Sequence, residues 1–387
     1  MRAHRGAAIR PRPLAAMQLH LLLLLLPTVA QLSAQGRWHH PAPRLMTAAQ
    51  RRSQVAQRNS ACNGSAVVVV SCWGFDPADS TEFLQAALDS GARKIIVPPM
   101  CDDSYDDCPT SQSTGDHSWV TLPLQLRSNQ VLLLQVGVQL WAKRWEYTGQ
   151  EDSVLNLEYV SNVDIIGYGA FIHMWKQDYA YRPGAPKTGP GTCHKQVGVP
   201  CNYSKAEWRH AINMVEAENV TISGLTVSSS GGDGVQVGGW SKASYPSAAC
   251  TAAANTNPAC HTPEIMKRGG CCRVSVSKNV HIRDFTATNN YRQGMSVTGA
   301  VNLLVEDSIF ELTGGTAPMC GVDFEPDKDA NLMQNITFRR CQTRNNYECG
   351  FSFTLYACTV EEAAPSITLQ DCHSTGDRVS YPCSPNN

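Results

Sequence analysis

A short motif recurs along this chain, in which an asparagine precedes a run of alternating apolar and polar residues. The copies begin at Asn162, Asn219, Asn279, Asn302 and Asn335. Alternating apolar residues are typical of β-strands, and no helical periodicity lies between the copies. Because one turn of such strands cannot bury its own apolar face, the repeat predicts turns that stack into an all-β solenoid. We therefore predict a single-stranded, right-handed parallel β-helix with an asparagine ladder. An antiparallel sandwich is the alternative, and the single phase of the asparagines argues against it.

A second strand of each turn aligns in segments whose third and fifth positions are apolar. These segments are residues 210–214, 233–237, 293–297, 320–324 and 349–353. Because strand side chains alternate between two faces, the apolar positions are expected to point into the coil and positions two and four outward. Polar residues beside this strand should then form columns on one face. Those with useful chemistry are Arg209, His210, Asp233, Arg292, Gln293, Asp323 and Glu325.

The chain contains 16 cysteines, and an even number in a secreted chain predicts disulfides. Cys320 and Cys349 fall at one phase of neighbouring turns, as do Cys341 and Cys372. Adjacent strands lie ~4.8 Å apart, within the Cα separation that a disulfide tolerates. We predict a disulfide for each pair, with stacked free thiols in the core as the alternative. The cysteines and histidines lack the spacing of a zinc site, and no metal site is predicted.

The N-terminus has the character of an export signal. Residues 1–16 hold four arginines and no acidic residue, and a leucine-rich run follows. This run is shorter than the ~20 residues that span a bilayer. We predict a signal peptide over residues 1–34, and therefore a secreted protein of the cell wall or matrix with no membrane attachment after cleavage.

The rest of the chain divides into a linker over residues 35–60 and the β-helix over residues 61–383. Insertions near 176–207 and 240–272 are rich in Gly, Pro, Ala and Cys, and they are expected to be loops beside a site. Residues 79–88 predict a short helix that covers the N-terminal end of the coil. The glycosylation sequons at Asn63 and Asn202 lie in loop-like sequence, and both are predicted to carry glycans.

Several segments carry a resemblance to a known group of proteins. They are residues 79–88, 96–99, 124–133, 206–210, 231–234, 292–294 and 321–326. These segments resemble extracellular right-handed β-helix proteins of the pectate-lyase-like and polygalacturonase-like superfamily, and the resemblance covers roughly residues 65–375. It implies the fold and a polysaccharide partner. The group includes glycoside hydrolases, polysaccharide lyases, uronan epimerases and proteins without activity, so the fold does not select the reaction.

The chain departs from the catalytic motifs of this group. Only Gly232-Asp233-Gly234 lies near one motif expected of a polygalacturonase. The Asn-Thr-Asp, Gly-His-Gly and Arg-Ile-Lys motifs of that family are missing, as is the Asp-Pro-His motif of alginate epimerases. The resemblance therefore does not supply a catalytic set.

Three carboxylates on the predicted face suit hydrolysis of a glycosidic bond, which needs one carboxyl as acid and a second as nucleophile or base. Asp323 and Glu325 are two residues apart on one strand, about 6.6 Å at the backbone, and Asp233 lies two turns away. Close like charges raise the pKa of one carboxyl, as a general acid requires. We predict Asp233, Asp323 and Glu325 as catalytic residues.

Four neighbours are predicted to bind substrate, with the arginines gripping a uronate or sulfate through bidentate contacts. They are Arg209, His210, Arg292 and Gln293. A structural interpretation stands beside this one: Asp233 caps a turn, Glu325 pairs with an arginine, and Arg209 and His210 form a ladder with Asp233.

The leading hypothesis is a secreted glycoside hydrolase that acts on an extracellular polysaccharide, acidic if the arginines grip it, without a cofactor. The first alternative is a polysaccharide lyase or uronan epimerase, in which Arg209, His210 and Arg292 are the catalysts and calcium is a cofactor. The second is a glycan-binding or cell-wall structural protein without activity. The partner is a polysaccharide in each case and the chain is expected to be a monomer. The 32 basic and 33 acidic residues nearly balance, which gives no indication of a nucleic-acid partner.

Overall fold

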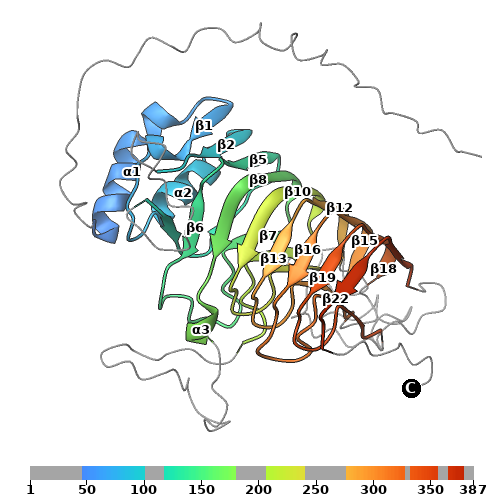
Figure 1. The fold of residues 1–387 in the computed structure, drawn as a ribbon. Coiled ribbons are helices and arrows are strands. Elements are labelled where there is room, and N and C mark those ends of the chain that lie inside the picture. Colours follow the sequence, from blue (N-terminus) through green and yellow to red (C-terminus); the bar gives the residue numbers. More distant parts are fainter. Residues whose placement is uncertain are drawn as a thin grey trace, which may run out of the picture. The chain divides into compact units, whose positions relative to one another are not determined.

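The computed structural model describes residues 46–100, 117–179, 206–239, 276–326, 332–355 and 365–378. Within them the chain winds through stacked turns of short strands (Figure 1), and every strand pairing is parallel. The predicted all-β parallel β-helix is confirmed. The predicted signal peptide and Asn202 lie outside the described residues, as do most of the two predicted insertions.

The larger sheet contains 15 strands, and its central path runs through consecutive turns of the coil. The strands on this path are β1 (Val67–Val69), β2 (Lys94–Val97), β5 (Gln130–Leu134), β8 (Ser161–His173), β10 (Glu218–Ser228), β12 (Ser277–Arg283), β15 (Ala300–Glu306), β18 (Met333–Arg339) and β21 (Ile367–Gln370). Beside it lie β3 (Trp119–Thr121), β6 (Gln139–Ala142), β13 (Thr286–Thr288), β16 (Ile309–Glu311), β19 (Gln342–Arg344) and β22 (His373–Thr375).

A second sheet of seven strands closes the other side of each turn. Its strands are β4 (Leu124–Gln125), β7 (Leu155–Glu158), β9 (Ile212–Val215), β11 (Val235–Gly238), β14 (Met295–Val297), β17 (Val322–Phe324) and β20 (Phe351–Phe353). The register pairs Ile212 with Val235, Val235 with Met295, and Met295 with Val322. This is the alignment predicted from the sequence. These four side chains are fully buried, so the predicted inward positions are confirmed.

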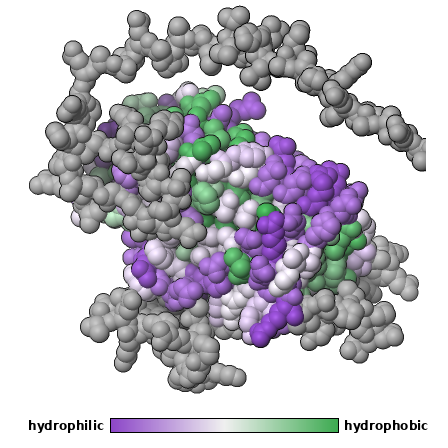
Figure 2. All heavy atoms as spheres, viewed as in Figure 1, coloured by the Kyte–Doolittle hydropathy of each residue, from purple (hydrophilic) through white to green (hydrophobic). Residues whose placement is uncertain are grey.

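The core between the sheets contains a row of aromatic rings from successive turns. Phe285, Phe310 and Phe338 follow one another with ring centroids 6.4 Å apart, and all three are fully buried. On the outside, hydrophilic side chains gather over the strands β12, β15 and β18 (Figure 2). Glu306 on β15 accepts hydrogen bonds from Arg339 and from His281 on the two flanking strands. Apolar side chains inside and ion pairs outside explain why the strands alternate in sequence.

The recurring asparagines form the predicted ladder. The side-chain amide of Asn219 donates to Asn162 over 3.1 Å, and Asn279 donates to Asn219 over 2.9 Å. The ladder continues through Asn302 and Asn335, and at its other end Asn162 donates to Asn129. Each of these asparagines has a positive φ, between 52° and 64°, a conformation that asparagine tolerates better than most residues. One residue type thus supplies both the turn and the contact between turns.

Two helices lie at the N-terminal end of the coil. The predicted helix is α2 (Thr81–Leu88), and the Asp79 carboxylate accepts the backbone N–H of Thr81 at its start. The preceding α1 (Ala48–Cys62) falls largely in the segment expected to be a linker. It is anchored by Arg51, which is buried and forms ion pairs with Asp76, Asp79 and Glu82. Among the described residues, no helix is long and apolar enough to cross a membrane.

The described cysteines confirm one predicted disulfide and correct the other. Cys320 and Cys349 form a disulfide between neighbouring turns, with Cα atoms 4.5 Å apart. Cys341 and Cys372 are free thiols, so the prediction of a disulfide between them is wrong and the alternative of stacked thiols holds. Each thiol is satisfied by hydrogen bonds to backbone carbonyls instead.

A second disulfide and one glycosylation sequon lie at the end of α1. A disulfide that was not predicted joins Cys62, at the end of α1, to Cys72. Asn63 is exposed directly after α1, and its glycosylation stays a prediction.

Candidate functional site

The first residues of the five aligned segments form a column along the second sheet. In the first three of them, the side chain accepts the backbone N–H of the next residue in the column. His210 Nδ1 accepts the N–H of Asp233 over 3.1 Å. Asp233 Oδ1 accepts the N–H of Gln293, and Gln293 Oε1 accepts the N–H of Cys320, both over 3.0 Å. The last step, from Cys320 to Cys349, is the disulfide. We call these residues the position-one column.

Glycines allow the turns of this column to approach closely. A Cβ atom on Gly232 would lie 2.3 Å from the carbonyl oxygen of Glu207, and one on Gly234 would lie 2.6 Å from that of Gly294. No side chain fits at either place, because backbone atoms cannot move aside. The run Gly231-Gly232-Asp233-Gly234 therefore places the Asp233 carboxyl against the neighbouring turns on both sides.

The contacts of the position-one column determine the tautomer and the protonation of His210. Since Nδ1 accepts a backbone N–H, the ring proton of the neutral imidazole is on Nε2. Burial, aided by the positive charge of Arg292, lowers the pKa of His210 to about 3. The separation of 3.4 Å between Nδ1 and Asp233 Oδ2 is therefore not an ion pair at neutral pH.

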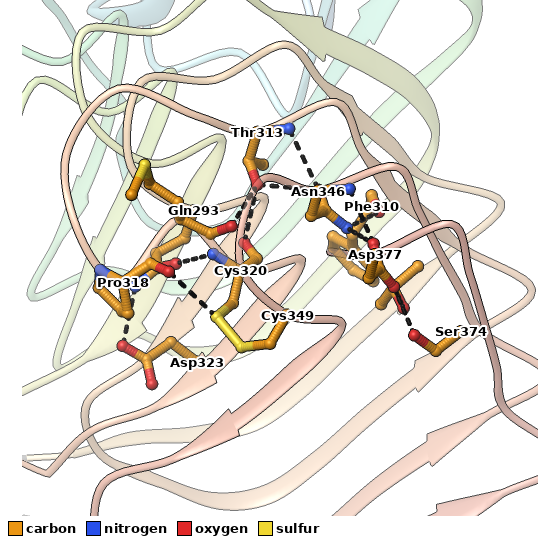
Figure 3. The surroundings of a disulfide bond; sticks show 12 residues. Gln293, Phe310, Thr313, Pro318, Cys320, Asp323, Asn346, Cys349, Ser374 and Asp377 are labelled. Carbon is orange, nitrogen blue, oxygen red and sulfur yellow. Dashed lines mark hydrogen bonds between the residues drawn. A yellow bond between two sulfur atoms is a disulfide. The ribbon is translucent and has the colours of Figure 1, made fainter. Parts of the chain in front are cut away.

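Two carboxyls of the predicted set are buried and each has one oxygen without a hydrogen bond. Asp233 is 1% exposed and Asp323 is fully buried, and the oxygens that make no hydrogen bond are Oδ2 of Asp233 and Oδ1 of Asp323. Gln293 joins the two carboxyls. Its backbone N–H donates to Asp233, and its side-chain amide donates to Asp323 Oδ2 over 2.8 Å, the contact drawn in Figure 3.

Burial changes the acidity of both groups. It raises the pKa of Asp233 to about 6, against the opposing charge of Arg292. It raises the pKa of Asp323 to about 7, with a further contribution from the negative charge of Glu325. At neutral pH a large fraction of Asp323 is therefore protonated, as a proton donor must be.

Arg292 is the cation at the centre of the carboxylates. It forms an ion pair with Glu325 over 2.5 Å, and its guanidinium lies 3.6 Å from Asp233 and 3.6 Å from Glu207. The surrounding carboxylates raise its pKa despite burial, so it stays charged. The side chains of Glu207 and Glu325 are 34% and 29% exposed, and through them this cluster reaches solvent.

Glu207 was not among the predicted site residues. It comes two positions before Arg209, just ahead of the first segment of the second sheet. No local pattern indicates Glu207, because its contact with Arg292 joins two turns of the coil and Glu207 lies outside the strands. Its neighbour Trp208 is 47% exposed.

Arg209 takes a different direction from the other predicted residues. It is fully buried, and its guanidinium donates to the carbonyl oxygens of Gly149 and Thr148 and lies over the ring of Tyr179. It braces the turn that precedes β7. The structure thus gathers Asp233, Arg292, Gln293, Asp323 and Glu325 with His210 at the edge, and it directs Arg209 to a loop.

In the part of the chain that the structure describes, no group of three or more histidine, cysteine, aspartate or glutamate side chains is arranged to hold an ion. The roles of the predicted residues in catalysis and substrate binding stay predictions.

Comparison with known proteins bears on the fold. A family model described as a right handed beta helix region matches residues 201–376. The predicted resemblance to right-handed parallel β-helix proteins is thereby confirmed for the fold. No curated protein matches the chain in sequence.

Solved structures share the architecture at low sequence identity. The chain is similar to the tailspike protein gp49 of Acinetobacter baumannii bacteriophage Fri1, a capsular polysaccharide depolymerase, with 10% identity, a TM-score of 0.49, and coverage of 81% of this chain and 47% of that one. An iota-carrageenase in complex with iota-carrageenan fragments has 13% identity and a TM-score of 0.42, covering 76% and 59%. A polygalacturonase from Erwinia carotovora has 13% identity and a TM-score of 0.36, covering 81% and 93%. The chain thus spans less than two thirds of the first two proteins, and the likeness concerns the fold.

Proposed function

We propose that this protein is a glycoside hydrolase that acts on a polysaccharide outside the cell. The observation that carries the proposal is the pair of buried carboxyls, Asp233 and Asp323, joined through Gln293 and adjacent to Glu325. Hydrolysis of a glycosidic bond requires a carboxyl that holds its proton near neutral pH and a second carboxylate nearby.

Asp323 is the proposed general acid. Its unpartnered oxygen Oδ1 leaves a position for a proton that a glycosidic oxygen would take up. Glu325 is the proposed base or nucleophile, because it shares the strand end with Asp323, reaches solvent and is ion-paired to Arg292. Asp233 is the proposed second buried acid: its carboxylate lies near Arg292, and its negative charge helps to raise the pKa of Asp323.

The substrate class rests on the resemblance seen in the sequence and on the surface around the cluster. Trp208 is exposed beside Glu207, and an exposed indole stacks well on a sugar ring. The stacked turns offer a long face on which a polymer rather than a small molecule would lie.

The contacts of the basic residues argue against a lyase. A lyase needs a base that accepts the proton at C5 of a uronate. His210 has its acceptor nitrogen occupied by a backbone N–H, and Arg292 is held among carboxylates that raise its pKa. Neither is prepared to accept a proton.

Glycan binding without hydrolysis is the second candidate, and burial favours it. Asp323 is fully buried and Asp233 is 1% exposed, so a substrate reaches them only if the site opens. A binding protein would need only the exposed Trp208 and the partly exposed Glu207 and Glu325.

The test is a digest of a polysaccharide panel by the secreted protein, followed by assays of reducing ends and of the ultraviolet absorbance of unsaturated uronates. Asp323→Asn should lower the rate by about 10²–10⁴-fold if Asp323 is the acid. The matched control is Asp307→Asn, which changes an exposed carboxylate that follows β15 of the larger sheet and pairs with Arg340. Reducing ends without absorbance support hydrolysis, absorbance supports a lyase, and saturable binding without either product supports the second candidate.

A further inference from the structure

We infer that the Cys320–Cys349 disulfide is a positioning element of the candidate site, and that it acts on Asp323 through the side chain of Gln293. This inference rests on the proposed function for its effect on rate. The contacts on which it depends are independent of that function.

The first step is the orientation of the Gln293 amide. Its Oε1 accepts the N–H of Cys320 over 3.0 Å, and so its NH2 group faces Asp323 Oδ2, to which it donates over 2.8 Å (Figure 3). A reversed amide would place its NH2 against the Cys320 N–H and its oxygen against the carboxylate. Because Gln293 is fully buried, no water is at hand to satisfy the reversed arrangement.

The second step is the anchoring of the Cys320 N–H. Cys320 lies near the end of the turn over residues 312–321, which has 10 residues, whereas the corresponding turns 229–234, 289–294 and 345–350 have 6 each. A longer turn has more backbone freedom. The disulfide ties its end to Cys349 in the shorter neighbouring turn, with the Cα atoms 4.5 Å apart.

The third step is the break in the position-one column. In the earlier turns a side chain of the column accepts the next N–H, as His210 does for Asp233 and Asp233 for Gln293. A cysteine offers only a weak acceptor. At Cys320 the disulfide therefore replaces the side-chain hydrogen bond of the column. This is one turn beyond Gln293, the residue that orients Asp323.

Gln293 is thus a positioning residue rather than a ligand of the substrate. Its amide hydrogen bond favours the ionised form of Asp323 and opposes the effect of burial. Loss of the bond should raise the pKa of Asp323, while burial itself is unchanged.

The experiment follows the carboxyl titration of Asp323 by ¹³C NMR of the full-length secreted protein labelled at aspartate, with Asp323→Asn to assign the signal. The Cys320→Ser/Cys349→Ser double variant and Gln293→Leu should each raise the titration midpoint by about one pH unit, since one charge-assisted hydrogen bond is lost. The control is Cys62→Ser/Cys72→Ser, which removes the remote disulfide at α1 and should leave the midpoint in place. If Asp323 is the general acid, the alkaline limb of the pH–rate profile should shift by the same amount, because the rate falls when the acid loses its proton.

An unchanged midpoint in Gln293→Leu overturns the inference, and this variant keeps the disulfide in case the double variant does not fold. An equal shift in both double variants also overturns it, because general loosening would then be the cause. A shift confined to the Cys320–Cys349 and Gln293 variants supports the inference even if no polysaccharide is cleaved. Failure of the proposed function is therefore distinguishable from failure of the positioning role.

Discussion

The backbone N–H of Asp233 donates to His210 Nδ1 over 3.1 Å, and this contact occupies the nitrogen at which the imidazole would otherwise accept a proton. Burial adds to the effect, and the pKa of His210 falls to about 3. An unfolded histidine has a pKa of about 6.5. Below that pH the unfolded chain binds a proton that His210 in the folded state does not, so His210 lowers stability progressively as the pH falls from about 6.5 to 3.

We predict that His210→Gln removes this part of the acid sensitivity. Glutamine occupies the same position in a later turn, where Gln293 accepts the N–H of Cys320, so the variant should fold. Its melting temperature should fall less than that of the wild type between pH 7 and pH 4. In the wild type, ¹⁵N NMR should find His210 neutral with its proton on Nε2 at pH 6. An imidazolium signal at that pH would contradict the assignment.

Asp323 has the opposite pH dependence. Its folded pKa of about 7 lies above the value of about 3.9 for an unfolded aspartate. As the pH rises through this interval the unfolded chain loses the proton first, and the stability contributed by Asp323 decreases. Asparagine cannot ionise, so Asp323→Asn should be more stable than the wild type at pH 8, by roughly 5–10 °C in melting temperature. At pH 4 the difference should vanish. A difference that is the same at both pH values would show that Asp323 titrates normally.

The repeat was predictable from the sequence because two requirements fall on the same residues. Asn219 and its counterparts need both a positive φ and a side chain that bonds to its own copy, and asparagine serves both. The columns followed, because once one residue of each strand is aligned, alternation fixes the faces of the others. The gathering of Asp233, Gln293 and Asp323 was predicted in this way.

Other features depend on contacts that no local pattern encodes. Arg209 has the same sequence signal as Arg292, yet it is directed to the carbonyl oxygens of Thr148 and Gly149 in a distant loop. The helix α1 has no apolar stripe to reveal it, because it is anchored by the buried ion pairs of Arg51. The cysteine pairs are a further example. Both pairs occupy matching positions in neighbouring turns, so position in the repeat did not show that Cys320 and Cys349 are bonded whereas Cys341 and Cys372 are free thiols.

Arg292 should be among the most sensitive residues of the site. Arg292→Met leaves Asp233 and Glu325 without their shared cation, and removal of one partner from a buried ion cluster costs about 3–5 kcal/mol. Arg292→Lys should lie between the wild type and this variant, since an ammonium makes no bidentate contacts. The measurement is denaturant unfolding at pH 7. The matched control is Arg127→Met, because Arg127 and Asp89 form a solvent-exposed pair, and such pairs contribute little. Equal losses in both would contradict a central role for Arg292.

The asparagine ladder offers a test that separates backbone strain from hydrogen bonding. Asn279 has a φ of 52° and bonds to Asn219 and Asn302. Asn279→Gly loses the two bonds and keeps the backbone conformation, at a cost of about 0.5–1.5 kcal/mol per bond. Asn279→Ala loses the same bonds and adds about 1–2 kcal/mol for a Cβ atom in the left-handed region. Denaturant unfolding should therefore rank the wild type above the glycine variant and the glycine variant above the alanine variant. A reversed order of the two variants would show that the left-handed backbone is not retained.

The thiols of Cys341 and Cys372 should be detectable by alkylation without reduction. Cys341 donates to the carbonyl oxygen of Val305 and Cys372 to that of Phe338, and burial raises the pKa of Cys341 to about 12. In the folded protein Cys372, which is only partly buried, should react first, because Cys341 is both inaccessible and protonated. In denaturant without reductant both should be labelled, whereas Cys320 and Cys349 should be protected until a reductant is added. Peptide mass spectrometry reads all four positions in one digest, and the reduced sample serves as the control for complete labelling. A peptide in which Cys341 is linked to Cys372 would contradict this prediction. It would show that the disulfide expected from their matching positions in the repeat does form, and that the two hydrogen bonds to backbone carbonyls do not keep the thiols apart.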